Sequence, residues 1–203
     1  MIRGYLFSIL FFLSTISFAQ VRVYEDLKGN IVSKEEFLHL RTKVSNLYAY
    51  RASNDTVFTF LYKGTRDFKG QLSESDLLRL KELYPFKEDN LPIVIQYFPG
   101  IDDCSAHYIS RTDEMITFLR EKNSKIAKGN KAVYYIYKSN DKVERISEKF
   151  KWKKDVDGFI ESLFFEYHFP CGSYVVVNKD GKFRGYKGEY GVSQIIDNYN
   201  KLK

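Results

Sequence analysis

The chain has 203 residues, with 32 Lys and Arg against 26 Asp and Glu, which gives a formal net charge of +6. Its 17 Phe and 16 Tyr supply ample apolar surface for a packed core and exclude a disordered or fibrous chain. The basic residues lie between acidic ones along the whole sequence, a pattern typical of a solvated surface, so we expect no nucleic-acid partner. The length fits one globular domain, with or without an extension.

The first residues have the layout of a secretory signal peptide. Arg3 precedes an apolar run, and the segment ends with the small-residue pattern Ser17-Phe18-Ala19. The apolar run is shorter than the roughly 20 residues that a membrane-spanning helix needs. We therefore expect a signal peptide over residues 1–19, export to the periplasm or the outside, and no membrane anchor after cleavage.

Residues 20–90 are expected to form an N-terminal extension without a recognisable catalytic motif. Ser33 and Ser73 are each followed three residues later by an acidic residue and then by apolar positions, which predicts the start of a helix at both places. Residues 56–62 are rich in β-branched and aromatic side chains and predict a strand. A charged loop at residues 87–90 separates this extension from the rest of the chain.

From residue 91 onward the pattern predicts strand, helix, strand, helix, β-hairpin and helix. The strands are expected at residues 93–98, 132–137, 173–177 and 182–186, and helical segments at residues 109–128, 143–150, 159–167 and 192–202. The Asp-Gly pair at residues 180–181 is a strong hairpin signal.

This order of elements resembles the thioredoxin-like fold, in particular the exported thiol-disulfide oxidoreductases of the TlpA type. The resemblance covers residues 91–203 and rests on three features: a buried strand that enters a loop bearing Cys104, the hairpin, and the C-terminal helix. It implies a three-layer α/β/α domain, thiol-redox activity toward a protein thiol or disulfide partner, and no cofactor.

The sequence departs from the TlpA pattern at two places. Cys104-Ser-Ala-His107 stands where the family has Cys-x-x-Cys. The family's stretch that begins with a cis-proline matches residues 172–182, which puts Gly172 at the proline position and Pro170 two residues earlier.

The resemblance implies that Cys104 and Cys171 meet in space, and three uses of the pair stay open. In the redox interpretation, Cys104 is the attacking thiolate, helped by a helix N-terminus and by His107, and Cys171 is the resolving partner. Asp102 and Asp103 oppose this chemistry because their negative charge disfavours a thiolate. The candidate catalytic residues are accordingly Cys104, Cys171 and His107.

The other two uses are not catalytic. In the first, a static disulfide stabilises an envelope protein with a binding or structural role, because an exported chain meets an oxidising compartment. In the second, the mirrored spacings Cys104-x-x-His107 and His168-x-x-Cys171 supply a tetrahedral zinc set. The spacing of these four residues is not specific, and we expect no metal.

Overall fold

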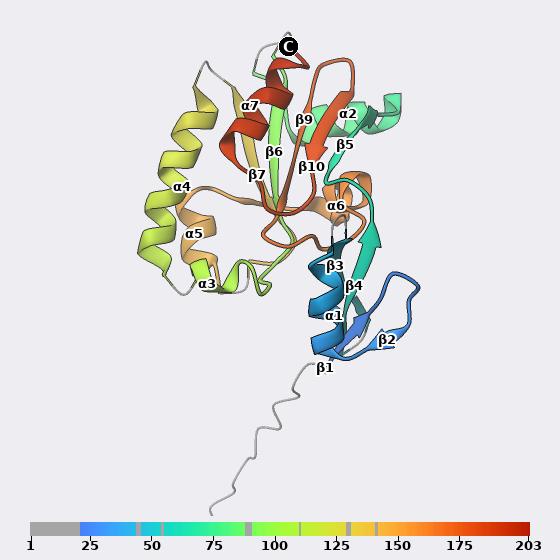
Figure 1. Cartoon of the computed structure of the whole chain (residues 1–203). Helices are drawn as coiled ribbons and strands as arrows, with labels where there is room; N and C mark the ends of the chain where they lie inside the picture. The colour runs from blue at the N-terminus through green and yellow to red at the C-terminus, as the bar shows by residue number, and fades with distance from the viewer. Residues whose placement is uncertain are drawn as a thin grey trace, which may run out of the picture.

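The computed structural model describes residues 21–43, 46–53, 55–87, 91–109, 111–128, 131–140 and 142–203. The predicted signal peptide, residues 1–19, lies outside the described residues. In the described part, the strands form two sheets, a four-stranded one of order β2-β1-β4-β3 and a six-stranded one of order β5-β10-β9-β6-β7-β8. Figure 1 shows the smaller sheet at one end of the larger one.

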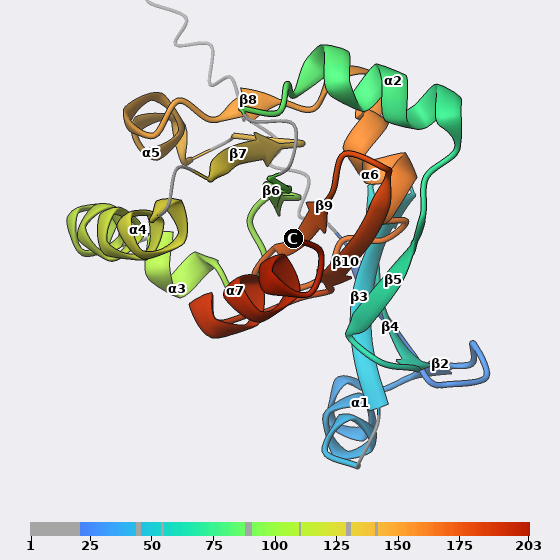
Figure 2. The same cartoon turned by 90° about the horizontal axis from the view of Figure 1, so that it is seen from above.

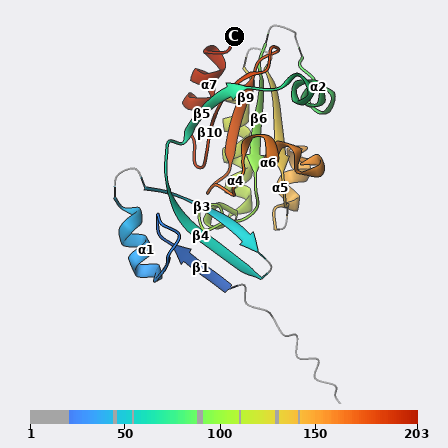
Figure 3. The same ribbon diagram turned by 90° about the vertical axis from the view of Figure 1, so that its right-hand side faces the viewer.

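The smaller sheet is built from the first residues of the described chain. Its strands are β1 (Val21–Glu25), β2 (Ile31–Val32), β3 (Asn46–Ser53) and β4 (Thr56–Lys63), and helix α1 (Lys34–Arg41) covers it. The buried ring of Phe37 on α1 packs against Tyr24 and Tyr48 of the sheet. Ser33 begins α1 as predicted, because its hydroxyl accepts a hydrogen bond from the backbone N–H of Glu36 at 3.1 Å. Figure 3 shows α1 against these strands.

The larger sheet has β6 near its centre. Its strands are β5 (Asp67–Gln71), β6 (Ile93–Phe98), β7 (Ala132–Tyr137), β8 (Lys153–Lys154), β9 (Ser173–Val177) and β10 (Lys182–Tyr186). β6 runs parallel to β7 and antiparallel to β9, and β9 forms a hairpin with β10. The apolar run of β6 is explained by burial on both faces, since Ile93 and Ile95 join one core and Val94 joins another.

Helices cover both faces of the larger sheet. They are α2 (Glu74–Leu83), α3 (Ala106–Ile109), α4 (Thr112–Ala127), α5 (Glu144–Lys149), η1 (Val156–Gly158, a 3₁₀ turn), α6 (Phe159–Phe164) and α7 (Val192–Asn200). Seen from above, α4 and α7 lie on one face and α2 and α6 on the other (Figure 2). The expected three-layer α/β/α arrangement is therefore confirmed, with the predicted order of elements. None of the helices that the structure describes is long and apolar enough to span a membrane.

Two details differ from the sequence-based expectation. The helix predicted over residues 159–167 ends at Phe164, because Phe165 leaves the helical conformation and stacks its ring on Tyr97, with 5.1 Å between ring centroids. In addition, β5 and α2, which belong to the predicted extension, join the larger sheet and its core: β5 pairs with β10, and Leu80 of α2 is fully buried.

Candidate functional site

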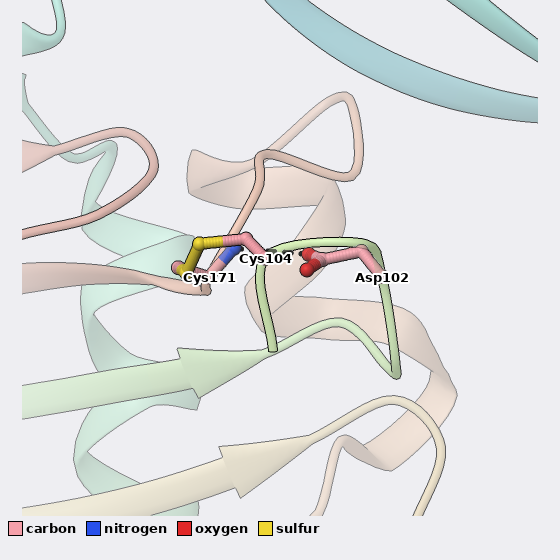
Figure 4. Close-up of side chains that lie close together, drawn as sticks. All are labelled: Asp102, Cys104 and Cys171. Carbon is pink, nitrogen blue, oxygen red and sulfur yellow. Dashed lines mark hydrogen bonds between the residues drawn. A yellow bond between two sulfur atoms is a disulfide. The ribbon is translucent and has the colours of Figure 1, made fainter. Parts of the chain in front are cut away.

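The two cysteines lie at the same end of neighbouring strands. Cys104 follows the end of β6, and Cys171 precedes the start of β9. Because β6 and β9 are antiparallel, with Tyr97 opposite Ser173, the end of one strand meets the start of the other. The cysteines form a disulfide across 67 residues, with 5.3 Å between their Cα atoms (Figure 4). The proximity implied by the resemblance is confirmed, and both residues are half-buried.

The backbone beside the disulfide has an unusual conformation. Cys171 and Gly172 both have positive φ, +64° and +84°. A side chain at position 172 would place its Cβ 2.8 Å from the carbonyl oxygen of Tyr97. Position 172 therefore requires glycine both because of its positive φ and because there is no room for a Cβ. No cis peptide bond occurs in the described part of the chain, so neither Pro170 nor Gly172 supplies the cis-proline of the TlpA pattern.

Asp102 is the buried polar group of this site. Its carboxylate accepts a hydrogen bond from the backbone N–H of Ser105 at 2.7 Å and another from the backbone N–H of Cys171 at 2.9 Å. His168 Nε2 lies 2.9 Å from the same oxygen that binds Cys171. Because an ionised carboxylate only accepts hydrogen bonds, His168 donates in this contact. Asp102 thus connects the loop after β6 to the segment before β9.

The charge of Asp102 is held in place by these contacts. Burial raises the pKa of its carboxyl group, but the hydrogen bonds from His168, Ser105 and Cys171 outweigh burial and leave the pKa below its usual range. Asp102 is therefore a carboxylate at neutral pH, and one of its oxygens lies within 4.8 Å of both cysteine sulfurs. A negative charge this close disfavours a thiolate at either cysteine once the disulfide is reduced.

The smaller sheet contributes to the site through two contacts. Tyr50 of β3 exchanges two backbone hydrogen bonds with His168, and the two rings meet edge to face with 5.1 Å between centroids. Arg22 of β1 forms an ion pair with Asp103 at 2.5 Å. The side chain of His168, 23% exposed, is therefore fixed between Tyr50 and Asp102.

The structure does not assemble the zinc set considered from the sequence. His107 is exposed on α3, and His168 is directed to Asp102. Among the described residues, the group with ligand atoms close enough for one metal ion consists of Asp102, Cys104 and Cys171, without either histidine. The cysteine sulfurs of that group are bonded to each other and are not available as thiolates.

The helix that was expected to support Cys104 is short. Cys104 is followed by α3, a single turn, and the longer helix α4 begins only at Thr112. The macrodipole of one turn is small, so the loop around Cys104 is ordered mainly by Asp102 and Ser105. The Ser105 hydroxyl accepts from the Asp102 backbone N–H at 2.9 Å, reciprocating the bond from the Ser105 N–H to the Asp102 carboxylate.

The sequence indicated Asp102 only as a charge that opposes thiolate formation, and His168 as one member of the zinc set. The Asp-x-x-Ser spacing of residues 102–105 is a local signal that could have revealed the reciprocal hydrogen bonds. The contacts of Asp102 with His168 and of Tyr50 with His168 left no local signal, because they join segments that are distant in sequence.

Comparisons with known proteins give similarity in fold. No protein-family model and no protein with a curated description matches the chain. Among solved structures, it is similar to a secreted disulfide oxidoreductase of Mycobacterium tuberculosis that is homologous to E. coli DsbE, with 14% identity, 55% of this chain and 82% of that chain covered, and a TM-score of 0.36. It is also similar to a DsbF homologue from Corynebacterium diphtheriae, with 9% identity, coverage of 69% and 87%, and a TM-score of 0.37.

The order of the strands and helices and their three layers agree with the thioredoxin-like fold that the sequence resembles. The TM-scores of these matches lie below 0.5, so the chemistry of the chain has to be judged from its own residues.

Proposed function

We propose that Cys104 and Cys171 are a redox pair that exchanges its disulfide with a dithiol of a partner protein. The observation that carries this proposal is the position of the disulfide at the carboxyl end of β6. At this end of the sheet the chain leaves β6 and continues to β7, the neighbour of β6 on one side. It later returns to β9, the neighbour of β6 on the other side. In open α/β sheets this is the place where functional groups gather.

The exchange conserves atoms and electrons. A substrate thiolate attacks Cys104 Sγ, a mixed disulfide forms, and Cys171 leaves as a thiolate that takes up a proton. The second substrate thiol loses its proton and attacks the substrate sulfur in the mixed disulfide, which releases Cys104 as a thiol. Two electrons pass from the substrate dithiol to the cysteine pair. In the reverse direction, Cys104 is the attacking residue and Cys171 the resolving one.

His107 belongs to this proposal as an exposed imidazole three residues after Cys104. We propose that it exchanges a proton with Cys104 during the reaction. His107→Ala is expected to slow the exchange without changing the equilibrium potential, because a proton carrier affects the rate alone.

The experiment is a redox titration of the full mature chain, read by alkylation of free thiols and intact mass. A midpoint between about −120 and −270 mV supports the proposal, since known oxidoreductases lie in this range. A midpoint below about −300 mV contradicts it. Reduction of insulin disulfides by the wild-type chain, lost in Cys104→Ser, gives the matching kinetic test. Ser124→Ala, at an exposed serine of α4, is a control that leaves both sulfurs and their loop unchanged.

A second candidate function is a binding or structural domain with a static Cys104–Cys171 disulfide. The observation that favours it is the buried carboxylate of Asp102, whose charge disfavours thiolates and so lowers the tendency of the bond to open. This candidate predicts the lower of the two potential ranges and no activity on insulin.

We also propose that the chain is an exported protein of the TlpA type and that it is divided into an N-terminal extension and a thioredoxin-like domain. A disulfide fits an oxidising compartment, and residues 1–19 have the pattern of a signal peptide, so we propose a periplasmic or secreted location. The intact mass of the chain recovered from an exporting cell tests cleavage after Ala19.

We keep residues 20–90 as the extension and residues 91–203 as the thioredoxin-like domain, although β5 and α2 of the extension complete the sheet and the core of that domain.

A further inference from the structure

A cavity of about 220 Å³ lies beside the disulfide, between α4, α5 and the face of β6 and β7. Figure 2 shows α4 and α5 at the β7 end of the sheet. Most of the lining is apolar and includes Met115, Leu119, Val143 and Ile146. The cavity reaches the surface at Phe118, which is 57% exposed although it is a large apolar residue.

Two buried hydrogen-bond donors that line the cavity have no partner among the residues that the structure describes. Gln96, 5% exposed, uses its carbonyl oxygen to accept from the Tyr190 hydroxyl at 3.0 Å, but its amide nitrogen makes no hydrogen bond. Tyr135 lies near enough to Gln96 for a side-chain interaction that opposes the rise of the Tyr135 pKa caused by burial, but no contact of the Gln96 amide nitrogen meets both the distance and the angle of a hydrogen bond. The indole nitrogen of Trp152 is also buried without a partner. Buried donors are nearly always paired, so both point to an acceptor that binds in the cavity.

A cation lies in the same cavity. Lys122 on α4 places its Nζ 3.9 Å from the ring centroid of Tyr190, and no carboxylate among the described residues forms an ion pair with it. Burial lowers the pKa of Lys122 to about 8, so it still carries its charge at neutral pH. Glu189 is an acidic residue of the lining, but its side chain is exposed.

We propose that this cavity is a binding site for a small carboxylate with an apolar body. The carboxylate meets the ammonium group of Lys122 and the unpaired amide of Gln96, while the apolar body lies against the side chains of α4 and α5. Tyr190 connects the two polar residues, since it contacts Lys122 through its ring and Gln96 through its hydroxyl. Cys171 also lines the cavity, but the proposed contacts with the carboxylate involve Lys122 and Gln96 and not the sulfurs, so the proposal goes beyond the redox function.

The volume limits the size of the ligand. Sites for drug-sized molecules usually measure about 300–1,000 Å³, so a smaller cavity fits a ligand of about ten non-hydrogen atoms. A medium-chain fatty acid such as octanoate, or an aromatic acid such as phenylpropanoate, has this size and chemistry.

The test uses Trp152, the single Trp of the chain, as a reporter inside the site. The oxidised full mature chain is titrated with octanoate and with phenylpropanoate while Trp fluorescence is recorded, and calorimetry gives the stoichiometry. Octylamine and octanol are matched probes that keep the apolar chain and change the head group. Lys122→Met removes the cation, and Lys125→Met, an exposed Lys on the same helix, is the control variant.

Saturable binding of either acid at one site, with at least tenfold weaker binding of octylamine and octanol, is the expected result. Lys122→Met is expected to weaken the acid at least tenfold, and Lys125→Met to leave it unchanged. No saturable binding of either acid, or equal binding of acid and amine by the wild-type chain, overturns the proposal. These probe comparisons need no variant, so they decide the matter even where Lys122→Met does not fold, and they are independent of any redox activity.

Discussion

The carboxylate of Asp102 accepts a hydrogen bond at 2.9 Å from the backbone N–H of Cys171, 69 residues later in the chain. The hydrogen bond and the Cys104–Cys171 disulfide join the same two segments, the loop after β6 and the segment before β9. The carboxylate therefore has two opposite effects. It orders the segment that holds Cys171, and it makes the reduced pair harder to ionise.

Asp102→Asn is expected to lower the free energy of unfolding at neutral pH by about 2–3 kcal/mol. The backbone N–H groups of Ser105 and Cys171 both lose a charged acceptor, and an amide cannot accept from both sides. Urea unfolding measures the change. Asp103→Asn is the control, because Asp103 is exposed and its ion pair with Arg22 is worth less than about 1 kcal/mol. Equal effects of the two substitutions would contradict the central role of Asp102.

The stability of the wild-type chain is expected to depend on pH through the same carboxyl group. Its pKa is lower in the folded chain than the unfolded value of about 3.9. The stabilisation is therefore complete above that unfolded value and is lost as the pH falls through the folded pKa. Urea unfolding at a series of acidic pH values measures the loss. The Asp102→Asn curve should lack this component, and a curve with the wild-type slope would refute the assignment.

His168→Phe is expected to make the potential of the disulfide more negative by about 30 mV, the equivalent of 1.4 kcal/mol. The N–H of His168 compensates part of the Asp102 charge, and without it the sulfurs experience more of that charge. A Phe ring keeps the contact with Tyr50. The redox titration described above measures the shift, with His39→Phe on the exposed side of α1 as a control. An unchanged or less negative potential would show that His168 does not moderate the charge.

The larger sheet was predictable where the sequence carries local signals. The four strands at residues 93–98, 132–137, 173–177 and 182–186 have the expected bounds, because each is a β-prone run ended by turn or loop residues. Gly181 in the hairpin turn has φ +82°, as an Asp-Gly turn requires. Local patterns of this kind depend on a few neighbouring residues.

The parts that could not be predicted depend on distant partners. β5 alternates polar residues with Phe68 and Gly70 and has little apolar character of its own. It becomes a strand because β10 offers a free edge, and Phe68 packs on Phe165 and Phe183. The site shows the same limit. The resemblance implied the cysteine pairing, but nothing local indicated that a buried carboxylate and His168 would lie beside it.

Gly172→Ala is expected to destabilise the chain by about 3 kcal/mol, from the cost of positive φ and from the close approach to the Tyr97 carbonyl oxygen. Gly29→Ala separates the two causes. Gly29 has φ +82°, nearly the same as Gly172, but in the described part of the chain no atom lies within 4 Å of the added Cβ. The Gly29→Ala variant should lose about 1–2 kcal/mol of its free energy of unfolding, which is the cost of a positive φ alone. Thermal and urea unfolding measure both variants, and equal losses would mean that the loop moves away from β6 to make room.

Leu80→Ala is expected to cost about 2–5 kcal/mol, because Leu80 is fully buried and its truncation leaves a cavity in the core of the larger sheet. Leu78→Ala is the matched control on the same helix, since Leu78 is 62% exposed and its truncation should change the free energy of unfolding by less than about 0.5 kcal/mol. The comparison tests whether α2, which precedes the predicted domain start at residue 91, stabilises the larger sheet. If urea unfolding shows a single transition, and Leu80→Ala shifts that transition while Leu78→Ala does not, then α2 stabilises the larger sheet. Two transitions, with the shift confined to one that leaves the larger sheet intact, would instead place α2 in an independent N-terminal unit.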